Sequence, residues 1–245
     1  MKSLSGMVGI VTGAGQSTDI GAAVATLLRE RGVTIVTTDT NGAGMQVDVT
    51  NGDEVSSCVS EVLAAHGKLD ILVNNAGTSI GSAAFLEQTA TDFEIAVDVN
   101  VRGMMLFSQA VIPHMRDGGG GSIVNIASLS GLKAMPAVPP VVTASRFAAV
   151  GMSKAIAQEF GPDNIRCNAV CPGAVTTGTR DGAPDLVAGL ESVATRDVIK
   201  AENSIIALGR RGEPAEIAAL VAYLCSPAGA YITGTAIPVD GGMGL

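Results

Sequence analysis

The chain has 245 residues, of which 47% are hydrophobic, 3% aromatic and 16% charged, and its formal net charge is −8. This length suits one α/β domain with a large buried core. The acidic balance and the few aromatic side chains exclude a typical nucleic-acid-binding surface, which needs cations for phosphates and rings for base stacking.

Cysteine and histidine usage predicts no metal site. The four cysteines, Cys58, Cys167, Cys171 and Cys225, have no Cys-x-x-Cys spacing, and only two histidines accompany them. We interpret them as reduced core thiols of a cytoplasmic protein. We recognise no secretory signal and no run of about 18 apolar residues that would cross a membrane. The expected partner is therefore a small-molecule substrate, not a nucleic acid or a membrane.

Apolar runs alternate with segments of helical periodicity, which is typical of a parallel sheet with crossover helices. The expected elements are strand 8–11, helix 20–31, strand 33–38, helix 53–66, strand 69–74, helix 100–115, strand 122–127, helix 143–160, strand 165–170, helix 213–225 and strand 236–239. Residues 176–203 have weak periodicity and several charges, and we interpret them as a lid. The sequence predicts one α/β domain over residues 1–245, a doubly wound parallel sheet of about seven strands with helices on both faces.

A glycine-rich turn joins the first expected strand to the first expected helix. Its glycines include Gly13, Gly15 and Gly21, and such a turn lets the backbone approach a pyrophosphate at a helix N-terminus. Asp39 ends the second strand, where its carboxylate can accept hydrogen bonds from a ribose diol and repel a 2′-phosphate. The pattern predicts a Rossmann-like dinucleotide site that favours NAD over NADP. An ordinary tight turn is the alternative.

The order of motifs along the whole chain resembles the short-chain dehydrogenase/reductase family. After the glycine-rich turn the chain carries, in order, Asp48-Val49, Asn74-Asn75-Ala76-Gly77, Asn100, Ser128 at a strand end, Pro172-Gly173 and Gly241-Gly242. Asn-Asn-Ala-Gly after one strand together with Pro-Gly after a later one is highly specific to that family.

The resemblance implies both a cofactor site and an oligomer. Its cofactor contacts fall on Gly13, Gly15, Ile20, Asp39, Asp48, Val49, Asn75, Ala76, Gly77, Pro172 and Gly173. Relatives usually form tetramers through the two long helices that correspond to 100–115 and 143–160, so a homotetramer or a homodimer is expected.

The phosphate loop departs from the family's pattern. The span from Gly13 to Gly21 is two residues longer than usual, and Asp19 stands where the family has its middle glycine. A carboxylate near a pyrophosphate costs Coulomb energy unless it turns away or caps the helix, and we expect Asp19 to be the N-cap. Weakened or lost dinucleotide binding is the alternative.

The catalytic positions depart further. The family surrounds the reacting carbonyl with a serine, a tyrosine, a lysine and an asparagine. The resemblance places the serine at Ser128 and the asparagine at Asn100, but the tyrosine falls on Val142 and the lysine on Arg146. Valine carries no proton. Arginine stays protonated, so it can hold the nicotinamide ribose or polarise a neighbour but cannot relay a proton.

Three functions remain open. The first, which we favour, is NAD-dependent hydride transfer to or from a small, apolar alcohol or carbonyl. Ser128, Thr143 or an ordered water would supply the proton, and Arg146 would stabilise an alkoxide. The second is a redox-neutral reaction such as elimination, cyclisation or dehalogenation, and the third is a non-catalytic partner protein. The proline- and valine-rich segment 135–142 predicts an apolar wall of the substrate pocket or a subunit contact.

Overall fold

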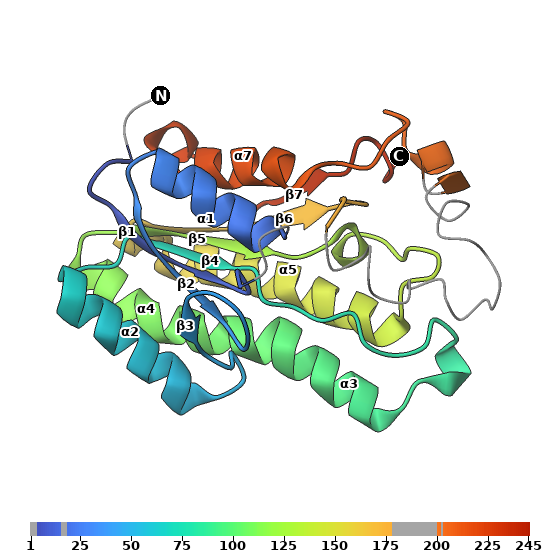
Figure 1. Cartoon of the computed structure of the whole chain (residues 1–245), viewed down its shortest axis with the longest axis horizontal. Coiled ribbons are helices and arrows are strands. Elements are labelled where there is room, and N and C mark those ends of the chain that lie inside the picture. Colours follow the sequence, from blue (N-terminus) through green and yellow to red (C-terminus); the bar gives the residue numbers. More distant parts are fainter. Residues whose placement is uncertain (1–3, 16–18, 178–199, 202) are drawn as a thin grey trace.

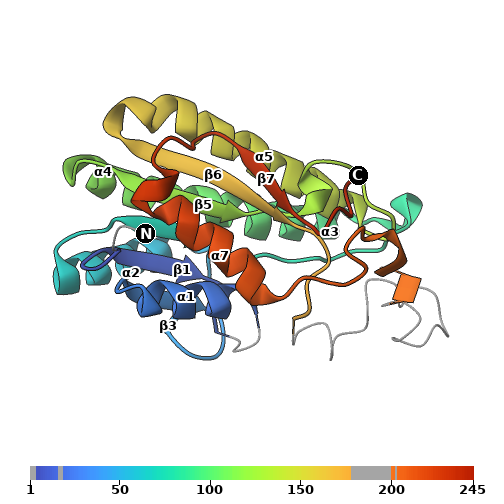
Figure 2. The ribbon, with the colours of Figure 1, turned by 90° about the horizontal axis from the view of Figure 1, so that it is seen from above.

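A parallel sheet with helices on both faces forms the centre of the computed structural model, which describes residues 4–15, 19–177, 200–201 and 203–245 (Figures 1 and 2). In these residues the sheet has seven strands in the order β3-β2-β1-β4-β5-β6-β7, and every pairing is parallel. The strands are β1 (Val8–Thr12), β2 (Thr34–Asp39), β3 (Met45–Gln46), β4 (Ile71–Asn74), β5 (Gly121–Ile126), β6 (Ile165–Pro172) and β7 (Ala236–Val239). The predicted doubly wound fold is confirmed.

The helices bury both faces of the sheet. They are α1 (Ile20–Glu30), α2 (Gly52–His66), α3 (Ala90–Val97), α4 (Met104–Asp117), α5 (Pro140–Phe160) and α7 (Pro214–Cys225). Leu28 of α1 and Ile217 of α7 belong to the cluster on one face, while Val59 of α2 and Phe107 of α4 belong to the cluster on the other. Because both faces are covered, strands such as β1 are buried at every residue.

The helix expected over residues 100–115 is longer than the sequence indicated. α3, the π-helical turn η2 (Asp98–Gly103) and α4 follow one another without a break from 90 to 117. The helix begins at a capping box, because the Thr89 hydroxyl accepts a hydrogen bond from Asp92 N–H and the Asp92 carboxylate accepts one from Thr89 N–H. This Thr-x-x-Asp signal marks the true start.

Other boundaries also differ from expectation. α5 begins at Pro140 and not at residue 143, because the fixed φ of a proline suits the first helical position. Val142 is therefore helical. The two-residue strand β3, which pairs with the end of β2, is too short for a periodic pattern to indicate. Most of the lid expected over 176–203 lies outside the described residues.

One helical stretch, 90–117, is long and apolar enough to cross a membrane by length and composition alone, contrary to the expectation from apolar runs. Three of its side chains, Phe107, Val111 and Met115, are fully buried in a core cluster with Leu72 and Ile123 of the sheet. A core helix of a globular domain meets the same test. Packing against the sheet therefore accounts for the apolar character of the stretch.

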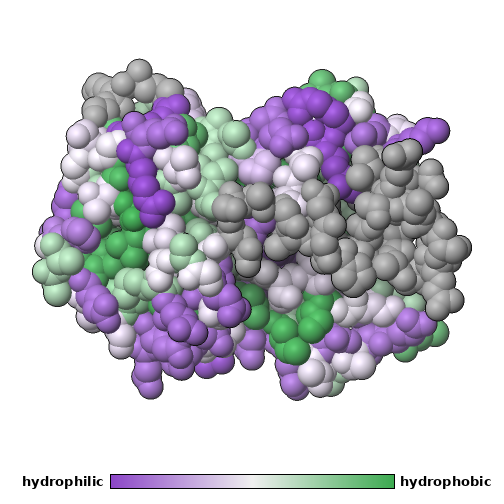
Figure 3. Space-filling model, in the orientation of Figure 1, coloured by the Kyte–Doolittle hydropathy of each residue, from purple (hydrophilic) through white to green (hydrophobic). Residues whose placement is uncertain are grey.

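Some large apolar side chains stay exposed near one edge of the molecule. Phe85 and Leu86 in the 3₁₀ turn η1 (Phe85–Glu87), and Phe93 in α3, are among them. Figure 3 shows an apolar patch over the region where α3 lies in Figure 1. Contiguous apolar surface is typical of interaction sites. The homo-oligomer remains a prediction, and this surface is a candidate for its subunit contact.

Phe107 is the largest fully buried side chain of the described core, and it supports a stability prediction. Phe107→Ala should lower the free energy of unfolding by about 3–5 kcal/mol, because it removes buried apolar area and leaves a cavity. Phe85→Ala is the matched control, since its ring is 73% exposed and should change stability by about 0.5 kcal/mol or less. Denaturant unfolding measures both. A cost below about 1 kcal/mol for Phe107→Ala would contradict this packing.

Candidate active site

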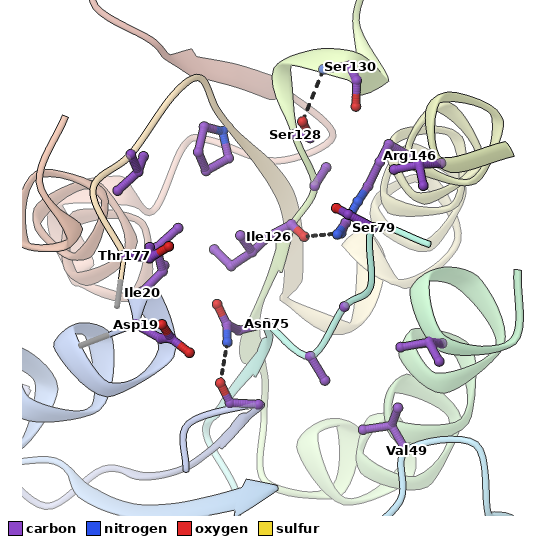
Figure 4. A pocket seen from close by; sticks show the side chains of 18 of the residues that line it. Asp19, Ile20, Val49, Asn75, Ser79, Ile126, Ser128, Ser130, Arg146 and Thr177 are labelled. Atoms are coloured by element: carbon purple, nitrogen blue, oxygen red, sulfur yellow. Dashed lines mark hydrogen bonds between the residues drawn. The ribbon is translucent and has the colours of Figure 1, made fainter. Parts of the chain in front are cut away.

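A cavity of about 560 Å³ opens at the carboxyl ends of the strands, where the strand order reverses between β1 and β4 (Figure 4). Ligands of open α/β sheets bind at such switch points. Most of the residues expected to bind a cofactor line this cavity, namely Gly13, Ile20, Asp39, Asp48, Val49, Asn75, Ala76, Gly77, Arg146, Pro172 and Gly173. Ser128 lines it as well. Residues that were predicted from separate motifs therefore line one continuous cavity.

The first glycine turn is fastened to the segment that follows β4. The Thr12 hydroxyl accepts hydrogen bonds from Asn75 N–H and Ala76 N–H, each at 3.0 Å. The Asn75 side-chain amide in turn donates to the carbonyl oxygens of Thr12 and Gly13, at 3.0 and 2.7 Å. Gly13 has φ +63°, and a Cβ there would lie 2.6 Å from Ala76 Cα. Glycine is required because the two segments touch.

Gly15 does not line the cavity, and its role differs from the expected one. Its N–H donates to Asp39 Oδ2 at 2.8 Å, while Asp39 Oδ1 accepts from Asn41 N–H at 3.3 Å. A Cβ at Gly15 would lie 2.1 Å from the Asn41 carbonyl oxygen. Gly15 thus fixes the carboxylate at the end of β2, which itself lines the cavity.

Asp19 occupies the N-cap position of α1 through its backbone, and its carbonyl oxygen accepts from Ala23 N–H. The expected N-cap position of Asp19 is thus confirmed, but its side chain makes no cap hydrogen bond. The carboxylate instead lines the cavity, which it faces in Figure 4. Asp19, Asp39 and Asp48 make this end of the cavity acidic. Residues 16–18 of the loop lie outside the described residues.

The opposite end of the cavity holds Ser128, Val142 and Arg146. Ser128 follows β5, and its Oγ accepts a hydrogen bond from Ser130 N–H at 3.1 Å. Val142 and Arg146 are one turn apart on α5 and both line the cavity. The two tyrosines, Tyr223 and Tyr231, are not among the described lining residues. The described residues at this end thus present hydroxyls, a cation and an apolar valine, but no phenol.

Arg146 is held over the backbone that leaves β4. Its Nη1 donates to the Ile126 carbonyl oxygen at 3.2 Å, and a Cβ at Gly77 would lie 2.6 Å from its Nη2. Burial lowers the pKa of the guanidinium to about 10, so it remains a cation at neutral pH. Burial also raises the pKa of the neighbouring Cys171 thiol to about 11, which keeps that thiol neutral.

Two residues expected to take part in catalysis do not line the cavity in the described structure. Asn100 is buried, with its Oδ1 accepting from Thr78 N–H and its Nδ2 donating to the Thr78 carbonyl oxygen and to Ser145 Oγ. It therefore ties the segment after β4 to α5. Thr143 follows Val142 on α5 and is turned about 100° around the helix axis from it. Neither position supports direct contact with substrate.

The cavity also contains residues that the motifs did not indicate. Ser130 lies two residues beyond Ser128, and the Ser-Leu-Ser spacing after a strand was the available signal. Ser79 lines the cavity from the segment that follows the Asn-Asn-Ala-Gly motif. Of the proline- and valine-rich segment 135–142, Val138 and Val142 line the cavity. The expected apolar wall is therefore present at two positions.

A parallel sheet of this order with a cavity at its switch point defines a nucleotide-binding type of α/β fold. The sequence model of the family described as "Enoyl-(Acyl carrier protein) reductase" matches residues 13–244. The chain is 31% identical to 3-oxoacyl-[acyl-carrier-protein] reductase FabG of Thermotoga maritima, over 98% of both chains. It is 37% identical to a 3-alpha-(or 20-beta)-hydroxysteroid dehydrogenase of Mycobacterium bovis, over 81% of this chain and 69% of that one.

Among solved structures, the ligand-free aldohexose dehydrogenase of Thermoplasma acidophilum has a TM-score of 0.89 to this chain at 31% identity, covering 98% of this chain and 94% of the other. The chain belongs to the short-chain dehydrogenase/reductase family of oxidoreductases. Members of this family usually use nicotinamide cofactors.

The four cysteines are free and buried. Burial raises the pKa of Cys58 and Cys171 to about 11, and of Cys167 and Cys225 to about 12, from an ordinary value of 9.0. Because each thiol has a higher pKa in the folded state than in the unfolded state, its protonated form contributes to folding stability below pH 9. This contribution is lost as the pH rises toward 11.

We expect the native protein at pH 8 to resist a thiol reagent, because the thiols are both inaccessible and protonated. All four should react after unfolding in guanidinium chloride. A colorimetric thiol count before and after unfolding measures this, and denaturant unfolding from pH 8 to 11 should show falling stability. A thiol that reacts within seconds in the native state would contradict the burial.

Proposed function

We propose that the chain is an NAD(H)-dependent oxidoreductase that acts on a small, apolar alcohol or carbonyl compound with a non-standard active site. The observation that carries this proposal is the single cavity that joins Asp39, at the end of β2, to Ser128 and Arg146. A dinucleotide needs a ribose acceptor at one end and a reaction site at the other, and one cavity offers both.

The described residues fit a nicotinamide dinucleotide. Gly13 gives side-chain-free backbone beside the N-terminus of α1, and the absence of a Cβ at Gly77 lets the Arg146 guanidinium lie against the backbone that follows β4. Asp39 would accept hydrogen bonds from the adenosine ribose, while Pro172 and Gly173 would flank the nicotinamide, as in the family. When bound, the nicotinamide would supply or accept the hydride.

NAD is favoured over NADP by the charges at the acidic end of the cavity. A 2′-phosphate on the ribose would approach the Asp39 carboxylate, which is already fixed by Gly15 N–H. In the described part of the chain, Arg146 is the only cation that lines the cavity, and it lies at the other end. Coulomb repulsion without a compensating cation disfavours the phosphate.

Ser128 and Arg146 carry the proposed chemistry of the reacting end. The Ser128 hydroxyl would donate to the substrate oxygen while its Oγ keeps the bond from Ser130 N–H. The Arg146 cation would stabilise negative charge on that oxygen. Since Val142 offers no proton, water would protonate the oxygen, and turnover would lack the general-acid contribution of about 10²–10⁴-fold.

The substrate class is inferred from the wall of the cavity. Val138 and Val142 present apolar side chains beside Ser128, which suits an apolar substrate body. The names of the similar proteins cover an acyl-carrier-protein reductase, a hydroxysteroid dehydrogenase and an aldohexose dehydrogenase. Those names are too diverse to select one substrate. The inference of an apolar substrate therefore rests on the side chains that line the cavity.

A redox-neutral reaction is the second candidate function. The observation that favours it is the Asp19 carboxylate, which lines the cavity beside the phosphate turn and would repel a pyrophosphate. In that case the chain would keep the cavity and Ser128 but turn over substrate without a nicotinamide. A non-catalytic role would leave the cavity without turnover.

The remaining expectations concern the setting of the protein. We place it in the cytoplasm as a homo-oligomer, acting on a small molecule and not on nucleic acid or membrane. The free, buried thiols and the exposed apolar surface at Phe85 and Phe93 support these parts of the proposal.

Calorimetric titration with NAD⁺, NADH, NADP⁺ and NADPH tests the cofactor. We expect micromolar binding of the non-phosphorylated pair and at least tenfold weaker binding of the phosphorylated pair. Asp39→Asn should weaken the binding of NADH and reduce the difference in affinity between NADH and NADPH. The substitution removes the negative charge but keeps an oxygen that can accept from Gly15 N–H. Asp117→Asn, an exposed change at the end of α4, is the control. If none of the four binds, a redox-neutral enzyme or a non-catalytic protein replaces the dehydrogenase as the proposed function.

The double variant Val142→Tyr with Arg146→Lys tests the geometry of the reacting end. It should raise NADH-dependent reduction of a carbonyl panel, by up to about 10²–10⁴-fold, because it installs a phenol and a lysine where the family has them. NADH absorbance measures the rate. Val141→Tyr with Arg146→Lys is the matched control, since position 141 is buried and does not line the cavity. Equal rates for the two double variants would refute the geometry.

A further inference from the structure

Ser130 carries a buried hydroxyl that has no partner in the described structure. The residue lies in the 3₁₀ turn η3 (Leu129–Gly131), is 1% exposed, and lines the cavity. Its Oγ has no hydrogen-bond partner among the described residues. Buried hydroxyls in folded proteins are nearly always hydrogen-bonded. A ligand at this end of the cavity would satisfy the Ser130 hydroxyl.

Arg146 presents an incompletely paired cation to the same end. Among the described residues it makes one hydrogen bond, to the Ile126 carbonyl oxygen, and no carboxylate lies within 4.0 Å of it. A guanidinium has five N–H donors, so most of its hydrogen-bonding capacity is unused. A partly buried charge without a counter-ion is unfavourable, and a bound anion would relieve that cost.

Packing between η3 and α5 brings the two groups to one place. A Cβ at Gly131 would lie 2.7 Å from the Arg146 carbonyl oxygen, so the turn that carries Ser130 rests on α5 at this residue. Ser128 is linked to Ser130 by the hydrogen bond between its Oγ and Ser130 N–H. Figure 4 shows the three side chains at the same end of the cavity.

The charges of the whole cavity select where an anion can bind. Asp19, Asp39 and Asp48 line the end that we assign to the adenosine and pyrophosphate. Arg146 is the only cation that lines the described part of the cavity. Among the described lining residues, an anionic group of the substrate therefore finds a cation only at the second end, next to Ser128.

We propose that Arg146 and Ser130 bind a carboxylate of the substrate. The flat guanidinium takes a carboxylate through two parallel N–H bonds, and the Ser130 hydroxyl donates a third. In this arrangement Ser128, and no longer Arg146, holds the alcohol or carbonyl oxygen, and Val138 and Val142 contact the apolar remainder. This inference rests on the proposed function and narrows its substrate to small acids that carry an alcohol or carbonyl group.

The titration of the full chain with butyrate tests the proposal, with butyramide as the neutral isostere and chloride as an anion that is not a carboxylate. Calorimetry is run with and without NAD⁺. We expect butyrate to bind at least tenfold more tightly than butyramide or chloride. Arg146→Gln should weaken the binding of butyrate at least tenfold, and Ser130→Ala should weaken it about threefold. The difference is expected because charge-assisted hydrogen bonds are stronger than neutral ones. Ser130→Ala removes no hydrogen bond of its Oγ in the described structure, so it should fold.

Arg102→Gln and Ser57→Ala, both exposed and outside the cavity, are the matched controls and should bind butyrate as the wild type does. Equal binding of butyrate and butyramide, or no effect of Ser130→Ala, would overturn the proposal. Chloride that binds as tightly as butyrate would indicate a halide site instead. If Arg146→Gln weakens NADH but not butyrate, the guanidinium holds the cofactor and the proposal is wrong.

The two proposals fail separately. NAD⁺ binding without any butyrate binding would remove the carboxylate site and leave the oxidoreductase. If butyrate binds in a way that depends on Arg146 but no dinucleotide binds, the carboxylate site is supported and the proposed cofactor is ruled out.

Discussion

The hydrogen bonds between Thr12 and the segment after β4 are the constraint on which the site depends. Where the strand order reverses, the chain leaving β1 turns to one face of the sheet and the chain leaving β4 turns to the other. Their backbone groups no longer meet in a ladder. The Thr12 hydroxyl and the Asn75 amide replace those bonds. This allows the two chains to diverge around a cavity while their first residues stay in contact.

That constraint leaves the two ends of the cavity free to differ in chemistry. At the acidic end, backbone N–H groups fix Asp39, the proposed acceptor for a ribose. The other end keeps Ser128 but combines it with a valine and a guanidinium. The resemblance assigns the position of the proton-transferring tyrosine to Val142 and that of the lysine to Arg146. Under the proposed function, Arg146 would therefore contribute to substrate binding and not to acid–base chemistry.

The sequence was sufficient where local chemistry decides the structure. Gly13 and Asp39 could be placed because one lies in the turn that follows a predicted strand and the other ends the next strand, and the apolar runs indicated where the long strands lie along the chain. The sequence was insufficient where contacts between distant segments decide. β3 exists only because two residues meet the end of β2, and Gly15 is needed only because residue 41 passes close to it.

The same limit applies to the side chains of the site. Asp19 has a cap residue's position, but its side chain lines the cavity, which no spacing along the chain could reveal. Asn100 matches its motif, yet its side-chain amide is hydrogen-bonded to Thr78 and Ser145. Ser130 belongs to no motif of the family, and only the structure shows that its buried hydroxyl has no hydrogen-bond partner among the described residues.

The bond between Gly15 N–H and Asp39 has an evolutionary consequence. The carboxylate that would discriminate between the two dinucleotides also anchors the glycine turn. A lineage that exchanged Asp39 for a small or basic residue, to accept a phosphorylated cofactor, would release that turn in the same step. Under the proposed function, a change of cofactor preference would therefore also disturb the turn at Gly15. A change of preference requires a second substitution that supplies another acceptor for Gly15.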